Sequence, residues 1–426
     1  MIAAFQRAHI PGGVVAMVSS SGPIEVVTFG VCQAGTPITS ELPFLIGSLS
    51  KPLTAATATR LAHQTRLDLD APIQSPKRPP GGPAAITLRQ LLNQTSGFSR
   101  RQGFSIPAPD SPAFDRLRPA GNPGAYAYSN LNYVILGQEL QARSGTRFEA
   151  LIAREVFAPL GMSSTAAPGR DHCGHRLFFG LVTPWAEEPV PAHLAPAGFI
   201  QASAPDLGKF LTALLAQARS GEDMGWPSLT LADSNPAEYH LGWRTAIDQG
   251  ERIWWHNGST GSYRATMVVM PAQDRAFVIL TNLGGHFVDD PVDDLALTLI
   301  AHVRGEPSQP PSSPLEPWAR MTLLLVVGWS LLALVLTARR WVARDRARPV
   351  SMKSIALSVA PWVAVGVVST FALHHFTGLS PLGVWRLAPD LGLTAVVVLL
   401  TGAARAAMKS SLPKPTKSSE KESPEA

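Results

Sequence analysis

Short β-rich runs lie at both ends of the first 305 residues and set the expected architecture. Residues 14–18 (VVAMV) and 24–29 (IEVVTF), joined by a Ser/Gly/Pro turn, predict a hairpin. Three further strand-like runs lie near the end of this region, at residues 252–256, 263–270 and 276–281. A helical stretch follows over residues 288–302. This order predicts an α+β fold, with an antiparallel sheet closed by both ends of the chain, flanked by helices and carrying an inserted helical lobe.

Beyond residue 305 the pattern changes to long uncharged runs. Residues 306–317 are rich in Pro and Ser and predict a linker after the first domain, residues 1–305. Three apolar runs then predict transmembrane helices, at about residues 321–338, 355–373 and 387–404. Asp390 in the third run must lie near an interface or face a partner helix. We therefore expect a membrane domain over residues 318–404 and a charged tail over residues 405–426.

Basic residues set the expected orientation in a lipid bilayer. Residues 339–353, between the first two runs, carry six Lys or Arg, whereas the loop before the third run carries only Arg386. Since basic loops stay in the cytoplasm, three spans place the large domain on the periplasmic or extracellular side of a bacterial cytoplasmic membrane and the C-terminus inside. Such export needs a signal peptide, which residues 1–10 do not resemble, so we expect the natural start to lie upstream.

The composition argues against a disordered protein and against a nucleic-acid-binding protein. Hydrophobic residues make up 45% of the 426 residues and charged residues 16%, against about 25% in typical soluble domains, which excludes general disorder. The net charge is +5, but the chain from Trp318 onward carries 13 basic and 5 acidic residues, which leaves 23 basic and 26 acidic residues before it. Because the main body is slightly acidic, we expect no nucleic-acid partner.

Cysteine and histidine usage gives no clear site. Cys32 and Cys173 could form one bridge, but we expect two ordinary small apolar residues. Residues 171–175 (DHCGH) contain possible ligands whose spacing fits no common zinc site, so we expect a polar loop, no metal and no cofactor.

A possible nucleophile lies in residues 47–51 (GSLSK), where the apolar run 44–46 gives way to a helix over residues 52–63. Ser48 and Lys51 are three residues apart, so a helix places them on one face. A serine attacks an acyl carbon only when a group accepts its proton, and a lysine can do so when burial lowers its pKa. The motif alone is equally compatible with the start of a surface helix.

Two further segments contain suitable partners. Tyr128 and Asn130 lie in a Pro/Gly-rich segment that would present side chains from a loop. His256, Gly258 and Ser259 end a β-run, where a side chain and a backbone N–H could face a substrate along the strand edge. Taken singly, the tyrosine is compatible with a core position and the histidine with an ordinary turn.

Together these segments resemble the serine β-lactamase and penicillin-binding-protein superfamily, in its class C β-lactamase-related branch. The S-x-x-K, Y-x-N and H-x-G motifs occur in the family's order within residues 8–304. Connecting segments are also similar, at residues 91–97, 159–162, 197–206 and 241–243. The resemblance implies an acyl-enzyme mechanism in which Ser48 is the nucleophile, Lys51 and Tyr128 handle its proton, and Asn130 orients the lysine and the substrate amide.

The resemblance also implies how the substrate is held. The backbone N–H groups of Ser48 and Ser259, next to Gly258, would form the oxyanion hole. His256 stands where many relatives carry lysine, so we expect it to supply a hydrogen bond or a conditional positive charge to the substrate. That replacement weakens the need for a carboxylate on the substrate.

A hydrolase domain followed by three spans is similar to the periplasmic peptidases that mature colibactin-type natural products by removing an N-acyl-D-asparagine cap. Residues 379–386 look similar to the turn between their second and third spans. Leu45 and Thr260, however, stand where polar residues would hold the asparagine side chain. We therefore expect an amidase or peptidase acting on a small-molecule or peptide substrate that is N-acylated or contains a D-amino acid.

Three alternatives stay open, and fold and motifs do not choose among them. One is hydrolysis of cell-wall peptides or β-lactams by a D,D-carboxypeptidase or β-lactamase. Another is an esterase. The third belongs to a different class: a penicillin-binding sensor that is acylated and turns over slowly. The sequence makes no prediction about the oligomeric state.

Overall fold

The computed structural model describes residues 5, 9–64, 66–74, 86–170, 173–186, 189–230, 238–285, 291–307, 315–342 and 389–410. The chain divides into two compact units, Met1–Leu315 and Glu316–Ala426. The second predicted span, residues 355–373, and the segment 379–386 lie outside the described residues, as does most of the predicted linker.

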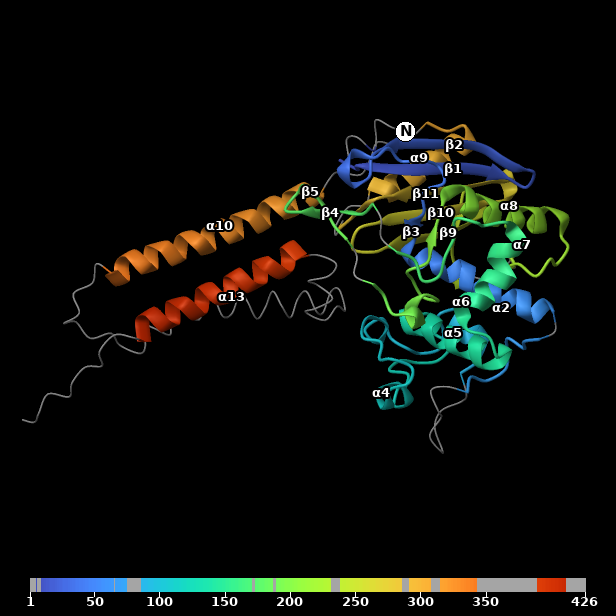
Figure 1. The fold of residues 1–426 in the computed structure, drawn as a ribbon, viewed down its shortest axis with the longest axis horizontal. Helices are drawn as coiled ribbons and strands as arrows, with labels where there is room; N and C mark the ends of the chain where they lie inside the picture. Colours follow the sequence, from blue (N-terminus) through green and yellow to red (C-terminus); the bar gives the residue numbers. More distant parts are fainter. Residues whose placement is uncertain are drawn as a thin grey trace, which may run out of the picture. The chain divides into compact units, whose positions relative to one another are not determined.

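The first unit is built on a seven-stranded antiparallel sheet with the order β2-β1-β11-β10-β9-β8-β7 (Figure 1). Both ends of the unit contribute, because β1 (Gly12–Ser19) pairs with β2 (Gly22–Gly30) on one side and with β11 (Arg275–Thr281) on the other. The remaining strands are β10 (Arg264–Met270), β9 (Glu251–Ser259), β8 (Trp243–Asp248) and β7 (Tyr239–His240). The predicted α+β fold with an antiparallel sheet is confirmed.

Strand β11 shows how the sheet is covered on both faces. Its successive side chains point to opposite sides, and those from residue 276 to residue 281 are all buried. One set packs in the core shared with α8 (Ala204–Ser220), and the other packs in the core shared with α9 (Pro291–Arg304). The two sets are Ala276, Val278 and Leu280, and Phe277 and Ile279. Burial on both faces explains why this strand reads as a continuous apolar run in the sequence.

The long middle of the chain forms the predicted helical part (Figure 1). Its two main helices are α2 (Ser50–His63) and α5 (Asn130–Ser144). Shorter helical elements are α3 (Leu88–Leu92), α4 (Pro112–Asp115), α6 (Phe148–Ile152), the π-helical η4 (Ala153–Phe157), α7 (Ala158–Leu160), and the 3-10 turns η1 (Gln33–Gly35), η2 (Gly47–Leu49), η3 (Gln102–Phe104), η5 (Ala192–Leu194) and η6 (Pro271–Gln273). Helix α2 is buried from residue 50 to residue 59, so its N-terminal side chains are held rigidly.

Two small sheets lie alongside the seven-stranded sheet and the helical part. In one, β3 (Phe44–Leu45) pairs with β6 (Gln201–Ala202) directly before the turn that leads into α2. The other has the order β12-β4-β5 and consists of β12 (Leu283–Gly284), β4 (His175–Phe178) and β5 (Leu181–Pro184). Because β12 follows β11 within two residues, this second sheet continues directly from strand β11 of the main sheet.

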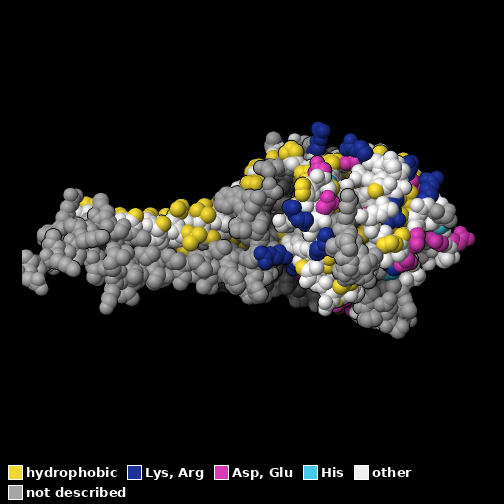
Figure 2. All heavy atoms as spheres, turned by 90° about the horizontal axis from the view of Figure 1, so that it is seen from below, with side chains coloured by type: hydrophobic (Ala, Val, Ile, Leu, Met, Phe, Trp, Pro, Cys, Tyr) yellow, Lys and Arg dark blue, Asp and Glu magenta, His cyan; other side chains and the backbone are white. Residues whose placement is uncertain are grey.

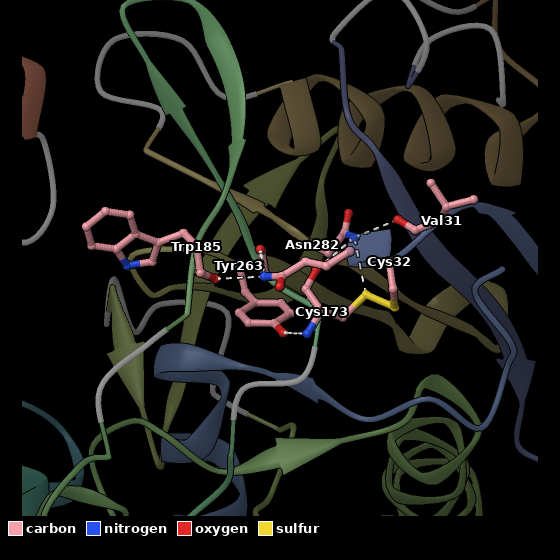
Figure 3. Close-up of a disulfide and its surroundings, with 8 residues drawn as sticks. Val31, Cys32, Cys173, Trp185, Tyr263 and Asn282 are labelled. Atoms are coloured by element: carbon pink, nitrogen blue, oxygen red, sulfur yellow. Dashed lines mark hydrogen bonds between the residues drawn. A yellow bond between two sulfur atoms is a disulfide. The ribbon is translucent and has the colours of Figure 1, made fainter. Parts of the chain in front are cut away.

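A disulfide joins the chain after β2 to the segment before β4 (Figure 3). Cys32 and Cys173 have Cα atoms 4.7 Å apart, so the expectation of two free apolar cysteines is wrong. Asn282 donates from Nδ2 to the carbonyl oxygens of Val31 at 3.0 Å and Cys173 at 3.1 Å. The backbone N–H of Cys173 donates to the Tyr263 hydroxyl at 2.9 Å. Two cysteines 141 residues apart give no sign in the sequence that the fold brings them together.

The second unit contains the helices α10 (Leu315–Val342) and α13 (Pro389–Ser410). Within the described residues, one helical stretch, Met321–Arg339, is long and apolar enough to cross a membrane, with a mean hydropathy of 2.3. Hydrophobic side chains are exposed along this helical unit (Figure 2). Residues 387–404 fall largely within α13, but three membrane crossings are not confirmed and stay a prediction.

Candidate active site

Ser48 lies on a tight turn between β3 and α2. The preceding Gly47 has φ +53°, which glycine adopts without strain. The hydroxyl of Ser50 donates to the Gly47 carbonyl at 2.7 Å and accepts from the N–H of Ile200 at 3.1 Å, so the turn is fastened on both sides. Ser48 itself is half-buried. The local sequence thus presents one serine hydroxyl at the N-terminal end of a rigid helix.

Lys51, one turn after Ser48, is completely buried, and its Nζ lies within hydrogen-bond distance of three oxygen atoms. Nζ lies 3.0 Å from Ser48 Oγ, 2.8 Å from Asn130 Oδ1 and 2.6 Å from the carbonyl oxygen of Ala197. Burial, and secondarily the positive charge of Arg244, holds the pKa of Lys51 well below its usual 10.5. A lysine in this environment loses its proton more readily than an exposed lysine does.

Tyr128 approaches the same serine from the loop before α5. Its hydroxyl donates to Ser48 Oγ at 2.9 Å, and Asn130, two residues later, is the first residue of the helix. Burial raises the pKa of Tyr128 to about 12, although the hydrogen bond to Ser48 and the charge of Arg244 act in the opposite direction. The tyrosine therefore keeps its proton at neutral pH. One serine hydroxyl thus lies between an amine and a phenol.

A buried polar network holds this loop in place. Gln94 Oε1 accepts from the backbone N–H of Ser129 at 2.9 Å and from the side-chain amide of Asn132. The hydroxyl of Ser96 donates to the other end of the Asn132 side chain. Because Ser129 lies next to Tyr128, the network sets the position of the tyrosine. The family-like segment 91–97 therefore supports the site without contributing a side chain that contacts the serine.

Strand β9 packs its backbone directly against the serine turn. A Cβ added to Gly258 would lie 2.0 Å from the carbonyl oxygen of Ile46 and 3.1 Å from the backbone nitrogen of Ser48. A Cβ added to Gly47 would lie 2.5 Å from the backbone nitrogen of Ser259. Only glycine at both positions allows this approach. It brings the backbone N–H groups of Ser48 and Ser259 into one small region, as two donors to a single oxyanion require.

His256 is fully buried, and both of its ring nitrogens have partners inside the protein. Nδ1 donates to the carbonyl oxygen of Asn257 at 2.7 Å, so Nε2 accepts from the Tyr239 hydroxyl at 3.1 Å. Burial, then the charges of Lys51 and Arg244, lowers the pKa of His256 well below 6.5. The ring is neutral at pH 7 and offers no positive charge, in contrast to the expectation of a conditional charge. A hydrogen bond from it to a substrate stays a prediction.

Arg244 on β8 is the main residue of the site that the motifs did not indicate. Its Nη1 donates to the Tyr126 hydroxyl at 3.2 Å, and its guanidinium lies 5.1 Å from the ring centre of Tyr128 and 5.3 Å from that of Trp255. The only sequence signal was its place directly after Trp243 in the family-like segment 241–243. Ala197 and Tyr239 were also missed, since a backbone acceptor and a second-layer tyrosine have no motif.

Comparison with known proteins agrees with this geometry. A family model described as Beta-lactamase matches residues 1–302. The chain is 26% identical over 320 residues to "Unguisins hydrolase ungD'" of Aspergillus campestris, covering 65% of this chain and 59% of that protein, so it spans less than two thirds of that relative. It is 23% identical to "Protein flp" of Staphylococcus aureus (strain COL), covering 86% of this chain and 79% of that protein.

A solved structure is similar as well. The octameric penicillin-binding protein homologue from Pyrococcus abyssi has a TM-score of 0.59 at 24% identity, covering 72% of this chain and 76% of that chain. The family model covers most of the chain. The chain therefore belongs to the β-lactamase family.

Proposed function

We propose that this protein is a serine hydrolase that acts through an acyl-enzyme intermediate. The observation that carries the proposal is the environment of one atom, Ser48 Oγ, which lies 3.0 Å from Lys51 Nζ and 2.9 Å from the Tyr128 hydroxyl. A serine becomes a nucleophile when a neighbouring base takes its proton. Here both neighbours can exchange protons with the hydroxyl, and both are held by buried contacts.

The partners of Lys51 favour a neutral amine as that base. A neutral amine has two N–H donors and one lone pair. Two of its partners, Asn130 Oδ1 and the Ala197 carbonyl oxygen, can only accept hydrogen bonds, so they take the two N–H groups. The lone pair is then directed at Ser48, which can donate its proton. The lowered pKa of Lys51 makes this neutral form accessible.

The proposed reaction has two stages with balanced proton transfers. Ser48 Oγ attacks the carbonyl carbon of an amide, its proton passes to Lys51, and the negative oxygen is held by the N–H groups of Ser48 and Ser259. The C–N bond breaks as Tyr128 donates its proton to the departing amine, and Lys51 returns a proton to the tyrosine. Water then attacks the acyl-serine and the same groups carry its proton back to Ser48, which releases the acid.

An amide substrate is favoured over an ester by the state of Tyr128. Its pKa of about 12 keeps the phenol protonated at neutral pH. The amine of an amide departs only after it receives a proton. The alcohol of many esters can depart with less help from a proton donor such as Tyr128. We infer that the substrate is a small molecule or peptide with an N-acylated or D-amino-acid-containing amide. Natural-product maturation, by removal of an acyl cap, is one reaction of this type.

We further propose that the protein is anchored in the bacterial cytoplasmic membrane with the hydrolase unit outside and the C-terminus in the cytoplasm. The apolar helix Met321–Arg339 supports an anchor. Basic residues follow it over residues 339–353, as expected on the cytoplasmic side. The disulfide between Cys32 and Cys173 supports an oxidising location for the hydrolase unit, because such bonds are rare in the cytoplasm.

The test is intact-mass analysis of the full chain in detergent after exposure to a fluorophosphonate. We expect one adduct on the wild type, none on Ser48→Ala, and one on the control Ser220→Ala, which changes an exposed serine at the end of α8. The wild type should also hydrolyse N-acyl-D-amino-acid amides. The absence of an adduct on folded wild-type protein would refute the proposal.

The same preparation separates the alternatives. Turnover of esters without amides would indicate an esterase, and release of D-alanine from a D-Ala-D-Ala peptide or opening of a β-lactam would indicate the cell-wall or β-lactam reaction. A β-lactam adduct on Ser48 that persists for hours would indicate a slow-turnover sensor.

A further inference from the structure

Arg244 is a half-buried arginine of the site that pairs with no carboxylate among the described residues. Arg244 donates from Nη1 to the Tyr126 hydroxyl, while its Nε is buried and has no hydrogen-bond partner. Among the ion pairs of the described part of the chain, none includes Arg244. A guanidinium removed from water without an anion is costly, and it presents five donors that match a planar carboxylate. The position is therefore suited to an anion that the described residues do not supply.

The arginine also lies beside one of the proposed reacting groups. Its guanidinium lies 5.1 Å from the ring centre of Tyr128, whose hydroxyl contacts Ser48 at 2.9 Å. Trp255, opposite Arg244 in the pairing of β8 with β9, lies 5.3 Å from it. Two aromatic rings thus hold the planar group, and its in-plane N–H donors are the part that can bind a ligand.

Because His256 is neutral, it does not provide the positive charge that a lysine at this position would provide. His256 has both nitrogens occupied by Asn257 and Tyr239, so it does not replace the lysine that many relatives carry. Arg244, on the neighbouring strand, is a cation near Tyr128 without a role in the proposed proton transfer, and its charge affects the pKa of Tyr128 more than that of Arg100 does. Its charge also lowers the pKa of Lys51, so an anion bound to Arg244 would make it easier for Lys51 to take the proton of Ser48.

We propose that Arg244 binds a carboxylate of the substrate and that the protein therefore selects N-acylated amides with a free carboxylate near the scissile bond. This inference rests on the proposed serine hydrolase function. It reverses the sequence-based expectation that a carboxylate matters little. A purely structural arginine, stacked on Tyr128 and Trp255, would leave the preference for substrate charge unchanged when it is replaced.

The experiment compares two matched pairs of amides with the full chain in detergent. N-acetyl-D-alanyl-D-alanine and its C-terminal carboxamide differ in a carboxylate on the leaving group. N-succinyl-D-alaninamide and N-succinamoyl-D-alaninamide differ in a carboxylate on the acyl side. For each pair, the kcat/KM of the acid is divided by that of its neutral partner, so that a general loss of folding or activity cancels in the ratio.

In the wild type we expect a ratio of about 10 to 100 for one pair, as charged hydrogen bonds typically give. The ratio should fall to near one in Arg244→Gln and stay intermediate in Arg244→Lys. It should be unchanged in Arg219→Gln, an exposed arginine that pairs with Asp274. If a glutamine variant is too slow for turnover, protection of Ser48 from fluorophosphonate by each acid and its neutral partner gives the same ratio.

Two results would overturn the inference: ratios near one for both pairs in the wild type, or a high ratio that survives in Arg244→Gln. These are distinct from failure of the proposed function, which would appear as a wild-type protein whose Ser48 takes no fluorophosphonate. Labelled Ser48 with turnover that ignores the carboxylate would refute the role of Arg244 alone.

Discussion

Replacing both Cys32 and Cys173 with alanine should lower the stability of the hydrolase unit substantially. The bond closes a loop with a sequence separation of 141 residues. In the chain-entropy treatment, a loop of this length restricts the unfolded state enough to stabilise the fold by about 5 kcal/mol. For a domain of this size that corresponds to a fall in melting temperature of roughly 10 °C. Little packing is lost besides the bond, because each substitution removes only a sulfur atom.

Tryptophan fluorescence of the full chain in detergent can follow this unfolding. Trp243 and Trp254 are completely buried in the first unit, so their emission should change when it unfolds. The wild type is melted with and without a reductant, next to the double alanine variant. We expect the reduced wild type to melt with the variant, and we expect the reductant to have no effect on the variant, which serves as the control.

Intact mass after alkylation in denaturant tests the bond directly. The oxidised wild type should take up no alkyl group and the reduced protein two. Two alkyl groups on untreated protein from an oxidising preparation would refute the bond. A double variant that melts together with the oxidised wild type would refute the stability argument, and the hydrogen bonds of Asn282 and Tyr263 around the same segment would then be sufficient.

Three further predictions concern the site. Gly258→Ala should push β9 away from the serine and slow fluorophosphonate labelling by about 100-fold, whereas Gly121→Ala, whose Cβ meets its nearest neighbour at 3.4 Å, should label normally. Equal rates would contradict the close packing. Tyr128→Phe should lower kcat/KM for amides by about 10² to 10⁴, and less for esters with good leaving groups; an equal loss for both would argue against proton donation to the amine. His256 has a lowered pKa, so below pH 6.5 the unfolded state binds a proton that the folded state does not, and the free energy of unfolding falls as pH falls. His256→Gln should reduce that slope by about 1.4 kcal/mol per pH unit in chemical denaturation, and an unchanged slope would contradict a neutral buried ring.

Of the strands that the pattern predicted, β1, β10 and β11 are buried on both faces, whereas β2 is largely exposed. Runs of β-branched and apolar residues mark β1, β10 and β11, because α8 and α9 cover the two sides of the sheet. Strands β7 and β8 were missed. The first has two residues, and the second is mostly exposed at its far end, so neither forms an apolar run or a clear alternation.

The site was predictable where its chemistry is local. Ser48 and Lys51 lie three residues apart, and any helix, buried or exposed, would place them on one face. Tyr128 and Asn130 lie about 80 residues further along, so only the resemblance to a family connected them with the serine. Their catalytic roles stay predictions, although the structure brings all four side chains together.

The sequence by itself determined the features that depend on neighbours in the chain: the apolar runs, the Ser48–Lys51 spacing and the basic segments. Tertiary structure decided the features that depend on neighbours in space. It paired Cys32 with Cys173, placed Arg244 against Tyr128, and buried His256 so that it stays neutral. The physical reason is that bond formation requires two atoms to meet, and a protonation state depends on burial and surrounding charge, neither of which is set by residue order alone.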